Sequence, residues 1–181
     1  MRMSLTLAIA VAAALTSPIL ADTVTPQQVL TFSPAVGSAG EWYYNGAGVL
    51  SFDQSIVVDS ALNSNYDALV GARVYLPTFQ ISGIPGAPYT LTPLGSSQIT
   101  IKSADNSVTY MTGTLAVGDL GTMGTVAGGY TEFKADISNL FITHEGAALG
   151  SAALAILEHL GLPALDFDLA FSGGSGPGYR N

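Results

Sequence analysis

The stretch from Tyr130 to Ser172 constrains the fold more than any other part of this chain, because its residue periods are clean. Apolar and polar residues alternate in 130–138 and again in 165–172. A period of two with one apolar face is typical of a half-buried β-strand. Between these strands, residues 147–160 carry apolar side chains at helical spacing, which predicts one α-helix with a buried stripe. The sequence therefore predicts a strand–helix–strand unit, with Thr143 capping the start of the helix and Gly161 its end.

Short strands separated by turn signals account for the upstream part of the chain. Asn45–Gly46 lies between two apolar runs, and this dipeptide favours a hairpin because both central residues must take positive φ. Further strands are predicted at 71–82, 89–92, 98–102 and 107–117. We expect a mainly β, antiparallel β-sandwich of about eight to nine strands, with the helix at about 147–160 in a crossover or capping an open end.

Residues 118–129 contain five glycines and several polar residues, a composition that predicts a loop rather than a strand. Two interpretations stay open, a plain surface loop and a loop that covers a ligand, because long loops on rigid sheets often carry binding.

The N-terminus has the pattern of a secretory leader. Arg2 is followed by an apolar run at 5–15, a break at Ser17–Pro18 and a small residue at Ala21 suited to cleavage. A membrane-spanning helix needs about 20 apolar residues, more than this run offers.

The predicted organisation is a signal peptide at 1–21, one domain at 22–172 and a flexible Gly-rich tail at 173–181. The protein is expected to be secreted, to the extracellular space or the periplasm. No transmembrane anchor is predicted.

Charge and cysteine content exclude several classes of function. After residue 21 the chain has thirteen acidic residues against four basic ones, and it has no cysteine. Nucleic acid and anionic membranes require positive patches, so neither is an expected partner. A lipidated N-terminal cysteine, thiol catalysis and thiolate metal sites are excluded as well. The acidity serves solubility or, alternatively, attracts cations such as Ca²⁺.

The aromatic run Trp42, Tyr43 and Tyr44 beside the Asn45–Gly46 turn is the candidate ligand-binding site. Aromatic rings of this kind stack on sugars, which makes carbohydrate a candidate ligand. Because consecutive strand residues alternate faces, at most two of the three point outward, and core packing takes at least one.

Asp166 and Asp168 are predicted to point to the same side of their strand, about 7 Å apart. Three interpretations stay open: an ordinary solvated face, a shared cation, or a pair of catalytic carboxylates at the spacing of an inverting glycosidase. A calcium site would need carboxylates from separate loops, for example Asp119 with Asp105 or Asp67.

No catalytic residues are predicted. The chain lacks the Gly-x-Ser-x-Gly motif of a nucleophile elbow. His144 and His159 lie at the two ends of the predicted helix, where dipole and capping roles explain them. Two histidines without ligand spacing do not predict a zinc site. We therefore expect a protein that is not an enzyme and needs no cofactor; if it is one, a carboxylate-based hydrolase is the expected class.

The overall layout resembles exported bacterial β-sandwich proteins of the PEP-CTERM-passenger type. The resemblance rests on the leader, the cysteine-free Gly/Thr-rich strands and the closing run from Phe167 to Gly174. Such proteins continue into a Pro-Glu-Pro tag, an apolar helix and a basic tail, whereas this chain ends at 175–181 without them. The resemblance implies a released member of this type and carries over no catalytic residues.

The predicted function is a secreted, non-enzymatic extracellular, cell-surface or matrix protein with a structural or binding role. A carbohydrate- or Ca²⁺-binding module is the first alternative, and a carboxylate-based hydrolase is the second. The expected partners are extracellular polysaccharide or surface proteins.

Overall fold

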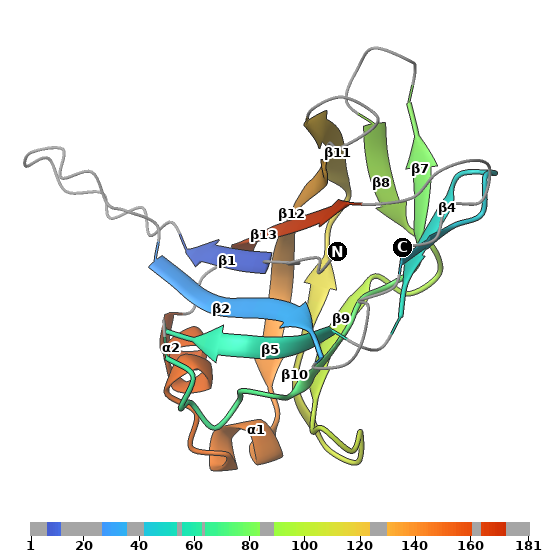
Figure 1. Ribbon diagram of the computed structural model, residues 1–181. Coiled ribbons are helices and arrows are strands. Elements are labelled where there is room, and N and C mark those ends of the chain that lie inside the picture. Colours follow the sequence, from blue (N-terminus) through green and yellow to red (C-terminus); the bar gives the residue numbers. More distant parts are fainter. Residues whose placement is uncertain are drawn as a thin grey trace, which may run out of the picture.

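The computed structural model describes eight segments of the chain: 7–11, 27–35, 42–53, 56–62, 64–83, 89–123, 130–160 and 164–172. Within them lie thirteen strands and two helices (Figure 1). The strands are β1 (Leu7–Val11), β2 (Gln27–Pro34), β3 (Trp42–Tyr44), β4 (Val49–Phe52), β5 (Ile56–Ala61), β6 (Arg73–Tyr75), β7 (Phe79–Ser82), β8 (Tyr89–Pro93), β9 (Gln98–Lys102), β10 (Thr109–Leu115), β11 (Gly118–Met123), β12 (Tyr130–Ile142) and β13 (Ala164–Ser172). The helices α1 (His144–Ala148) and α2 (Ala152–Leu160) connect β12 to β13.

All described strands belong to one antiparallel sheet, in the order β10-β9-β6-β5-β2-β1-β13-β12-β11-β8-β7-β4-β3. Because β10 also pairs with β12, the first eight strands of this order close into a ring. The other five strands, β11-β8-β7-β4-β3, extend from β12 as a second unit that we call the wing. In Figure 1 the wing rises above the ring, and the two helices lie below. The prediction of a mainly β, antiparallel fold is confirmed.

The sequence predicts a sandwich, with about eight to nine strands divided between two stacked sheets. This needs correction, because the long strand β12 joins the ring and the wing into one branched sheet. Its first half, 130–134, pairs with β11, and its second half, 137–142, pairs with β10. Only residues 116–117 separate β10 from β11, so the two strands follow each other along the same side of β12. A strand of thirteen residues can therefore serve the ring and the wing at once.

The predicted single helix at 147–160 is two helices in the structure. Gly150 takes φ +78°, which ends the first helix, and Ser151 begins the second by accepting a hydrogen bond from the amide three residues on. Thr143 caps α1, as predicted, by accepting a 2.9 Å hydrogen bond from the Gly146 amide. Gly161 lies outside the described residues, as do 173–181.

The predicted hairpin is present, since β3 pairs with β4, but its connection is the four residues 45–48, and positive φ occurs at Gly46 and Gly48, not at Asn45. Gly46 has φ +76°, and the Asn45 Oδ1 atom accepts hydrogen bonds from the amides of Ala47 (2.8 Å) and Val49 (2.9 Å). The strands predicted at 98–102 and 107–117 are present as β9 and β10, which pair antiparallel with each other. The strand predicted at 71–82 is two separate strands, β6 and β7.

The stretch 118–129, predicted to be a loop, begins with a strand: Gly118–Met123 form β11. Residues 124–129 lie outside the described part of the chain. The misleading feature is Gly118, which is buried at the junction of β11 and β12. A Cβ atom there would overlap the backbone carbonyl oxygen of Lys134. This glycine permits close approach of two strands rather than flexibility.

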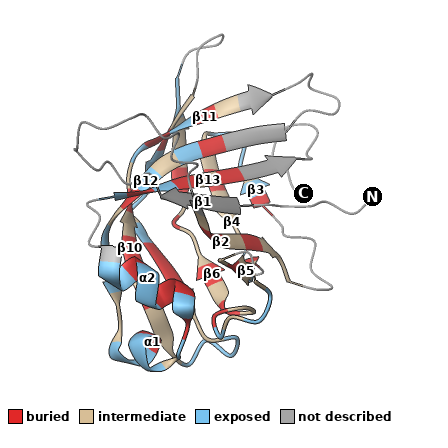
Figure 2. Ribbon diagram, turned by 90° about the vertical axis from the view of Figure 1, so that its left-hand side faces the viewer, coloured by how far each residue is buried: buried red, intermediate tan, exposed pale blue. Residues whose placement is uncertain are grey.

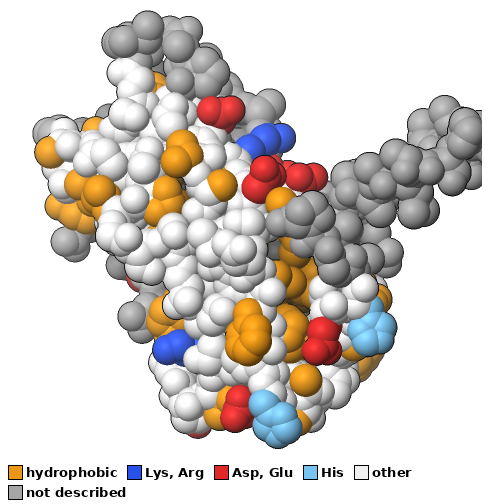
Figure 3. Space-filling model, turned by 180° about the vertical axis from the view of Figure 1, so that it is seen from behind, with side chains coloured by type: hydrophobic (Ala, Val, Ile, Leu, Met, Phe, Trp, Pro, Cys, Tyr) orange, Lys and Arg blue, Asp and Glu red, His pale blue; other side chains and the backbone are white. Residues whose placement is uncertain are grey.

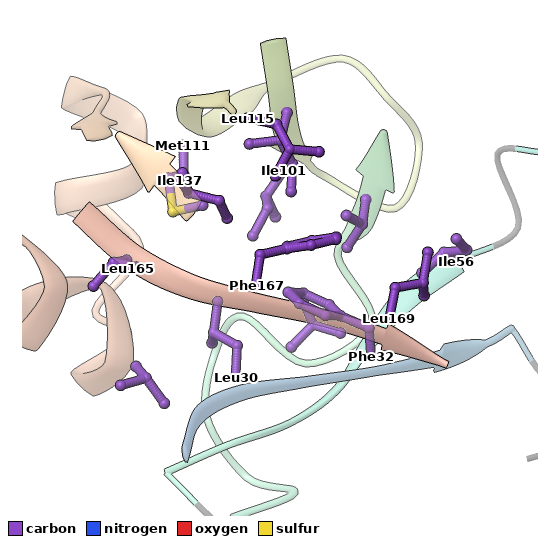
Figure 4. Packing of buried hydrophobic residues seen from close by; sticks show 14 of the residues in the cluster. Leu30, Phe32, Ile56, Ile101, Met111, Leu115, Ile137, Leu165, Phe167 and Leu169 are labelled. Carbon is purple, nitrogen blue, oxygen red and sulfur yellow. The ribbon is translucent and has the colours of Figure 1, made fainter. Parts of the chain in front are cut away.

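The hydrophobic core runs through the ring and into the wing (Figure 2). Figure 4 shows Phe167 and Leu169 of β13 pointing into the same cluster as Leu30 and Phe32 of β2. A row of edge-to-face aromatic contacts crosses from one unit to the other: Phe52–Phe79, Phe79–Phe133 and Phe133–Phe167, with ring centroids 6.3, 5.1 and 5.9 Å apart. The ring and the wing therefore share one core.

Residues 7–11, which the sequence predicts to belong to a secretory leader, form strand β1. It lies between β2 and β13 and pairs antiparallel with both (Figure 1). Leu7 stands opposite Phe32 on one side and Leu169 on the other. The apolar run thus supplies one of the eight strands of the ring.

Asp67 fixes the start of α2 from a loop more than eighty residues away in sequence. Its Oδ1 atom accepts a 2.8 Å hydrogen bond from the Leu69 amide, and its Oδ2 atom accepts one of 3.3 Å from the Ala153 amide. Burial raises the pKa of Asp67, but hydrogen bonds from Ser151, Leu69, Ala153 and Ala152 outweigh it and hold the pKa below its ordinary value. The ionised form is the one that stabilises the fold.

We expect Asp67→Asn to lower the free energy of unfolding at pH 7 by about 1 kcal/mol, because the amide nitrogen cannot accept from Ala153. The depressed pKa of Asp67 means that its contribution is complete above the pKa of the unfolded chain. The contribution is lost as pH falls through the folded pKa, so variant and wild type should converge in acid. Urea titrations at pH 7 and pH 3 measure this. Asp59→Asn, an equal charge change on an exposed side chain, is the control; a gap that persists unchanged at pH 3 would contradict the mechanism.

Candidate functional site

An open acidic cleft of about 410 Å³ lies over β11, β12 and β13, where the wing leaves the ring. Its charged lining consists of four carboxylates and one amine: Asp119, Lys134, Asp136, Asp166 and Asp168. Figure 3 shows acidic side chains beside a basic one in the upper part of the face seen from behind. The cleft is therefore strongly negative and accessible to solvent.

Strand pairing sets the arrangement of these charges. On one rung, Asp119 of β11 stands opposite Lys134 of β12, which in turn stands opposite Asp168 of β13. On the next rung, Asp136 of β12 stands directly opposite Asp166 of β13. These side chains share the outer face of the sheet because their strand neighbours Phe133, Ile137, Phe167 and Leu169 are buried.

A positive charge is present on the first rung only, where Lys134 stands between two aspartates. The Lys134 Nζ atom lies 3.9 Å from the Asp168 Oδ1 atom, an ion pair between side chains that are 59% and 36% exposed. At this exposure the pair contributes little to stability. On the second rung two carboxylates face each other, with Cβ atoms about 5 Å apart in such a pair, an arrangement that destabilises a sheet. A positive group bound in the cleft would remove this repulsion.

Three of the five charged residues of this cleft were considered from the sequence, Asp166 and Asp168 as a pair and Asp119 as a possible calcium ligand. Asp166 and Asp168 do share one face of their strand, as expected, with Asp166 exposed and Asp168 partly so. The sequence pattern did not place Asp119 beside them, and it missed Lys134 and Asp136. Lys134 and Asp136 alternate with buried residues in 130–138, so the sequence predicts that they point outward. Which residues stand opposite them on the neighbouring strands depends on strand register.

The aromatic run Trp42–Tyr44 is divided between the core and the surface. Trp42 is 8% exposed and belongs to the core, Tyr43 is 41% exposed, and Tyr44 is half-buried against the core. This is the alternation that the sequence predicts for consecutive strand residues. It leaves one broadly exposed ring, Tyr43, where three were considered for stacking on a sugar.

The three carboxylates considered for calcium occupy three different environments. Asp119 lines the cleft, Asp67 caps α2, and Asp105 organises its own turn. Hydrogen bonds from the Ser103 hydroxyl and from the amide and hydroxyl of Ser107 lower the pKa of Asp105 to about 2. Among the described residues, no three His, Asp or Glu side chains converge where they could hold a metal ion.

His144 begins α1 and His159 lies in the last turn of α2, both exposed. They therefore occupy the two ends of the helical connection, as predicted, although that connection is two helices. Neither described helix has the length and apolar content that crossing a membrane requires.

A scan against protein-family models gave no match, and searches among curated proteins and among solved structures gave none.

Proposed function

We propose that this chain is a secreted, non-enzymatic binding protein of the cell surface or extracellular matrix, and that the acidic cleft takes cationic side chains of a surface protein. The observation that best supports this proposal is the pair of facing carboxylates, Asp136 and Asp166, beside the Lys134–Asp168 ion pair. Repulsion between these two like charges destabilises the unbound protein, and a positive group that binds in the cleft relieves it.

The layout of the carboxylates favours an extended basic segment over a single ion. They lie on three strands and two rungs, with neighbouring strands about 4.8 Å apart and same-face residues about 7 Å apart. In an extended peptide, every second side chain points to the same side, about 7 Å from the next. Lys or Arg at every second position would therefore match the spacing of the two rungs. Rows of charge on a rigid sheet also need no reordering before they bind.

Ca²⁺ is the second candidate ligand because four carboxylates line one cleft, although no three of them converge closely enough to form a metal site in the described part of the chain. Oxygen atoms of carboxylates are the ligands that Ca²⁺ prefers. The same experiment separates the two ligands, because Ca²⁺ and a basic peptide are added in separate arms.

We expect a Lys-rich decapeptide to raise the melting temperature of the purified protein, and to do so less as salt is increased. In Asp136→Asn/Asp166→Asn the effect of the peptide should fall by more than half. This variant should itself be more stable than wild type by about 0.2–1 kcal/mol, because it removes the facing charges. Calorimetry and thermal melts measure both quantities.

The matched control is Asp59→Asn/Glu158→Gln, which removes two exposed negative charges on β5 and α2, away from the cleft. Equal loss of peptide binding in the two double variants would show attraction to net charge alone and would sink the assignment of the cleft. A melting shift with Ca²⁺ but none with the peptide would instead select the second candidate ligand.

A further inference from the structure

Strand β1 belongs both to the predicted secretory leader and to the folded ring. Its five residues lie within the apolar run 5–15 of the predicted secretory leader, and they are also the strand that closes the ring between β2 and β13. Cleavage after Ala21 would detach β1 from the folded chain. The ring would then lose one strand from its interior, not from an edge.

The gap so created has the features of a strand-accepting site on both of its sides. β1 runs antiparallel to β2 and to β13, so those two strands run parallel to each other and about 10 Å apart, twice the spacing of neighbouring strands. Each would present unpaired backbone amides and carbonyls toward the gap. Unpaired strand edges of this kind template the addition of another strand.

The walls of the gap are apolar on the inner side. Leu30 and Phe32 of β2 and Phe167 and Leu169 of β13 are at most 1% exposed. Figure 4 shows all four in one cluster beneath these strands. With β1 gone, water would reach apolar side chains that are buried in the closed ring, which is unfavourable. Filling the gap is therefore strongly favoured.

We propose that the gap between β2 and β13 is a binding site for an extended, uncharged, apolar peptide strand of about five residues, which the N-terminal segment fills until it is removed. The occupant is a partner strand with the chemistry of β1. Its orientation is antiparallel to both neighbours, and it places an apolar residue at the position of Leu7, opposite Phe32 and Leu169. On the proposed function, its source is a cell-surface or matrix protein.

The first test locates β1 in the full chain through a disulfide, which the absence of cysteine makes unambiguous. Ala8, Thr31 and Ser60 stand on one rung across β1, β2 and β5. Ala8→Cys/Thr31→Cys should crosslink under mild oxidation, because directly opposite Cβ atoms are about 5 Å apart. Ala8→Cys/Ser60→Cys spans two strand spacings and should not. Equal crosslinking of the two pairs would overturn the placement of β1.

The second test empties the site and refills it. A protease recognition sequence is inserted after Ala21 of the full chain, and the protein is produced without export and then cut. We expect the N-terminal fragment to remain bound at one copy per protein. After its removal in mild denaturant, a fluorescent peptide of residues 5–13 should bind with the same stoichiometry.

Two controls decide whether binding is strand addition. A peptide carrying Ala8→Pro lacks the backbone donor of a residue that is paired with both β2 and β13, and it should bind about tenfold or more weakly. The uncut protein should not bind the peptide, because β1 already fills the gap. Direct pairing of the parallel strands β2 and β13 would leave no site, so failure of the cut protein to bind overturns the proposal. Equal binding by uncut protein, or equal binding of the proline peptide, overturns it as well.

Discussion

Phe133→Ala is expected to lower the free energy of unfolding by about 3–5 kcal/mol, the cost of emptying a fully buried phenylalanine site. Phe133 has 0% exposure and lies in the middle of the aromatic row. Its ring centroid is 5.1 Å from that of Phe79 in the wing and 5.9 Å from that of Phe167 in the ring. The substitution therefore opens a cavity and also removes the aromatic contacts that join the cores of the two units.

Two probes distinguish these effects during urea unfolding. Trp42 is the single tryptophan and lies in the wing, so its fluorescence follows that unit, while circular dichroism follows the whole sheet. We expect coincident transitions in wild type and an earlier fluorescence transition in Phe133→Ala. Phe141→Ala is the matched control, because Phe141 is on the same strand but 61% exposed, and it should change stability by no more than about 0.5 kcal/mol. Equal losses in the two variants would contradict the shared core.

Local periodicity was sufficient to predict the faces of the central strands. Phe133 and Ile137 on β12 and Leu165, Phe167 and Leu169 on β13 are buried, as their alternation with polar residues predicts. The outward direction of Asp166 follows from the same pattern. Its partner does not: Asp136 stands opposite it only because β12 and β13 pair in one particular register.

The closure and branching of the sheet depend on contacts that no local pattern encodes. The pairing of β10 with β12 closes the ring because β10 and β11 run in succession along β12, with only residues 116–117 between them. At the N-terminus the difficulty is different. A run of Leu, Ala, Ile and Val satisfies the requirements of a leader and of a buried strand equally well, so residues 7–11 support both interpretations.

Composition was misleading at Gly118, and this residue provides the second large expected effect. Glycine-rich segments are usually interpreted as flexible, whereas here a missing side chain lets two strands approach. A Cβ atom on residue 118 would overlap the Lys134 carbonyl oxygen, and it would lie 2.6 Å from a ring carbon of Phe133 and 2.7 Å from the Ala135 Cβ atom. Backbone and core atoms cannot move aside as the end of a surface side chain can.

We therefore expect Gly118→Ala to lower the free energy of unfolding by about 3 kcal/mol, the upper end of the usual cost of overpacking. Gly121→Ala on the same strand is the control, since a Cβ atom there meets nothing within 4 Å. That variant should match wild type or gain up to about 1 kcal/mol, because alanine loses less backbone entropy on folding than glycine. Denaturant titrations of the pair measure the difference. Equal stability of the two variants would mean that β11 and β12 are not held at this close distance, and the geometry assigned to the acidic cleft, whose wall includes Gly118, would be wrong as well.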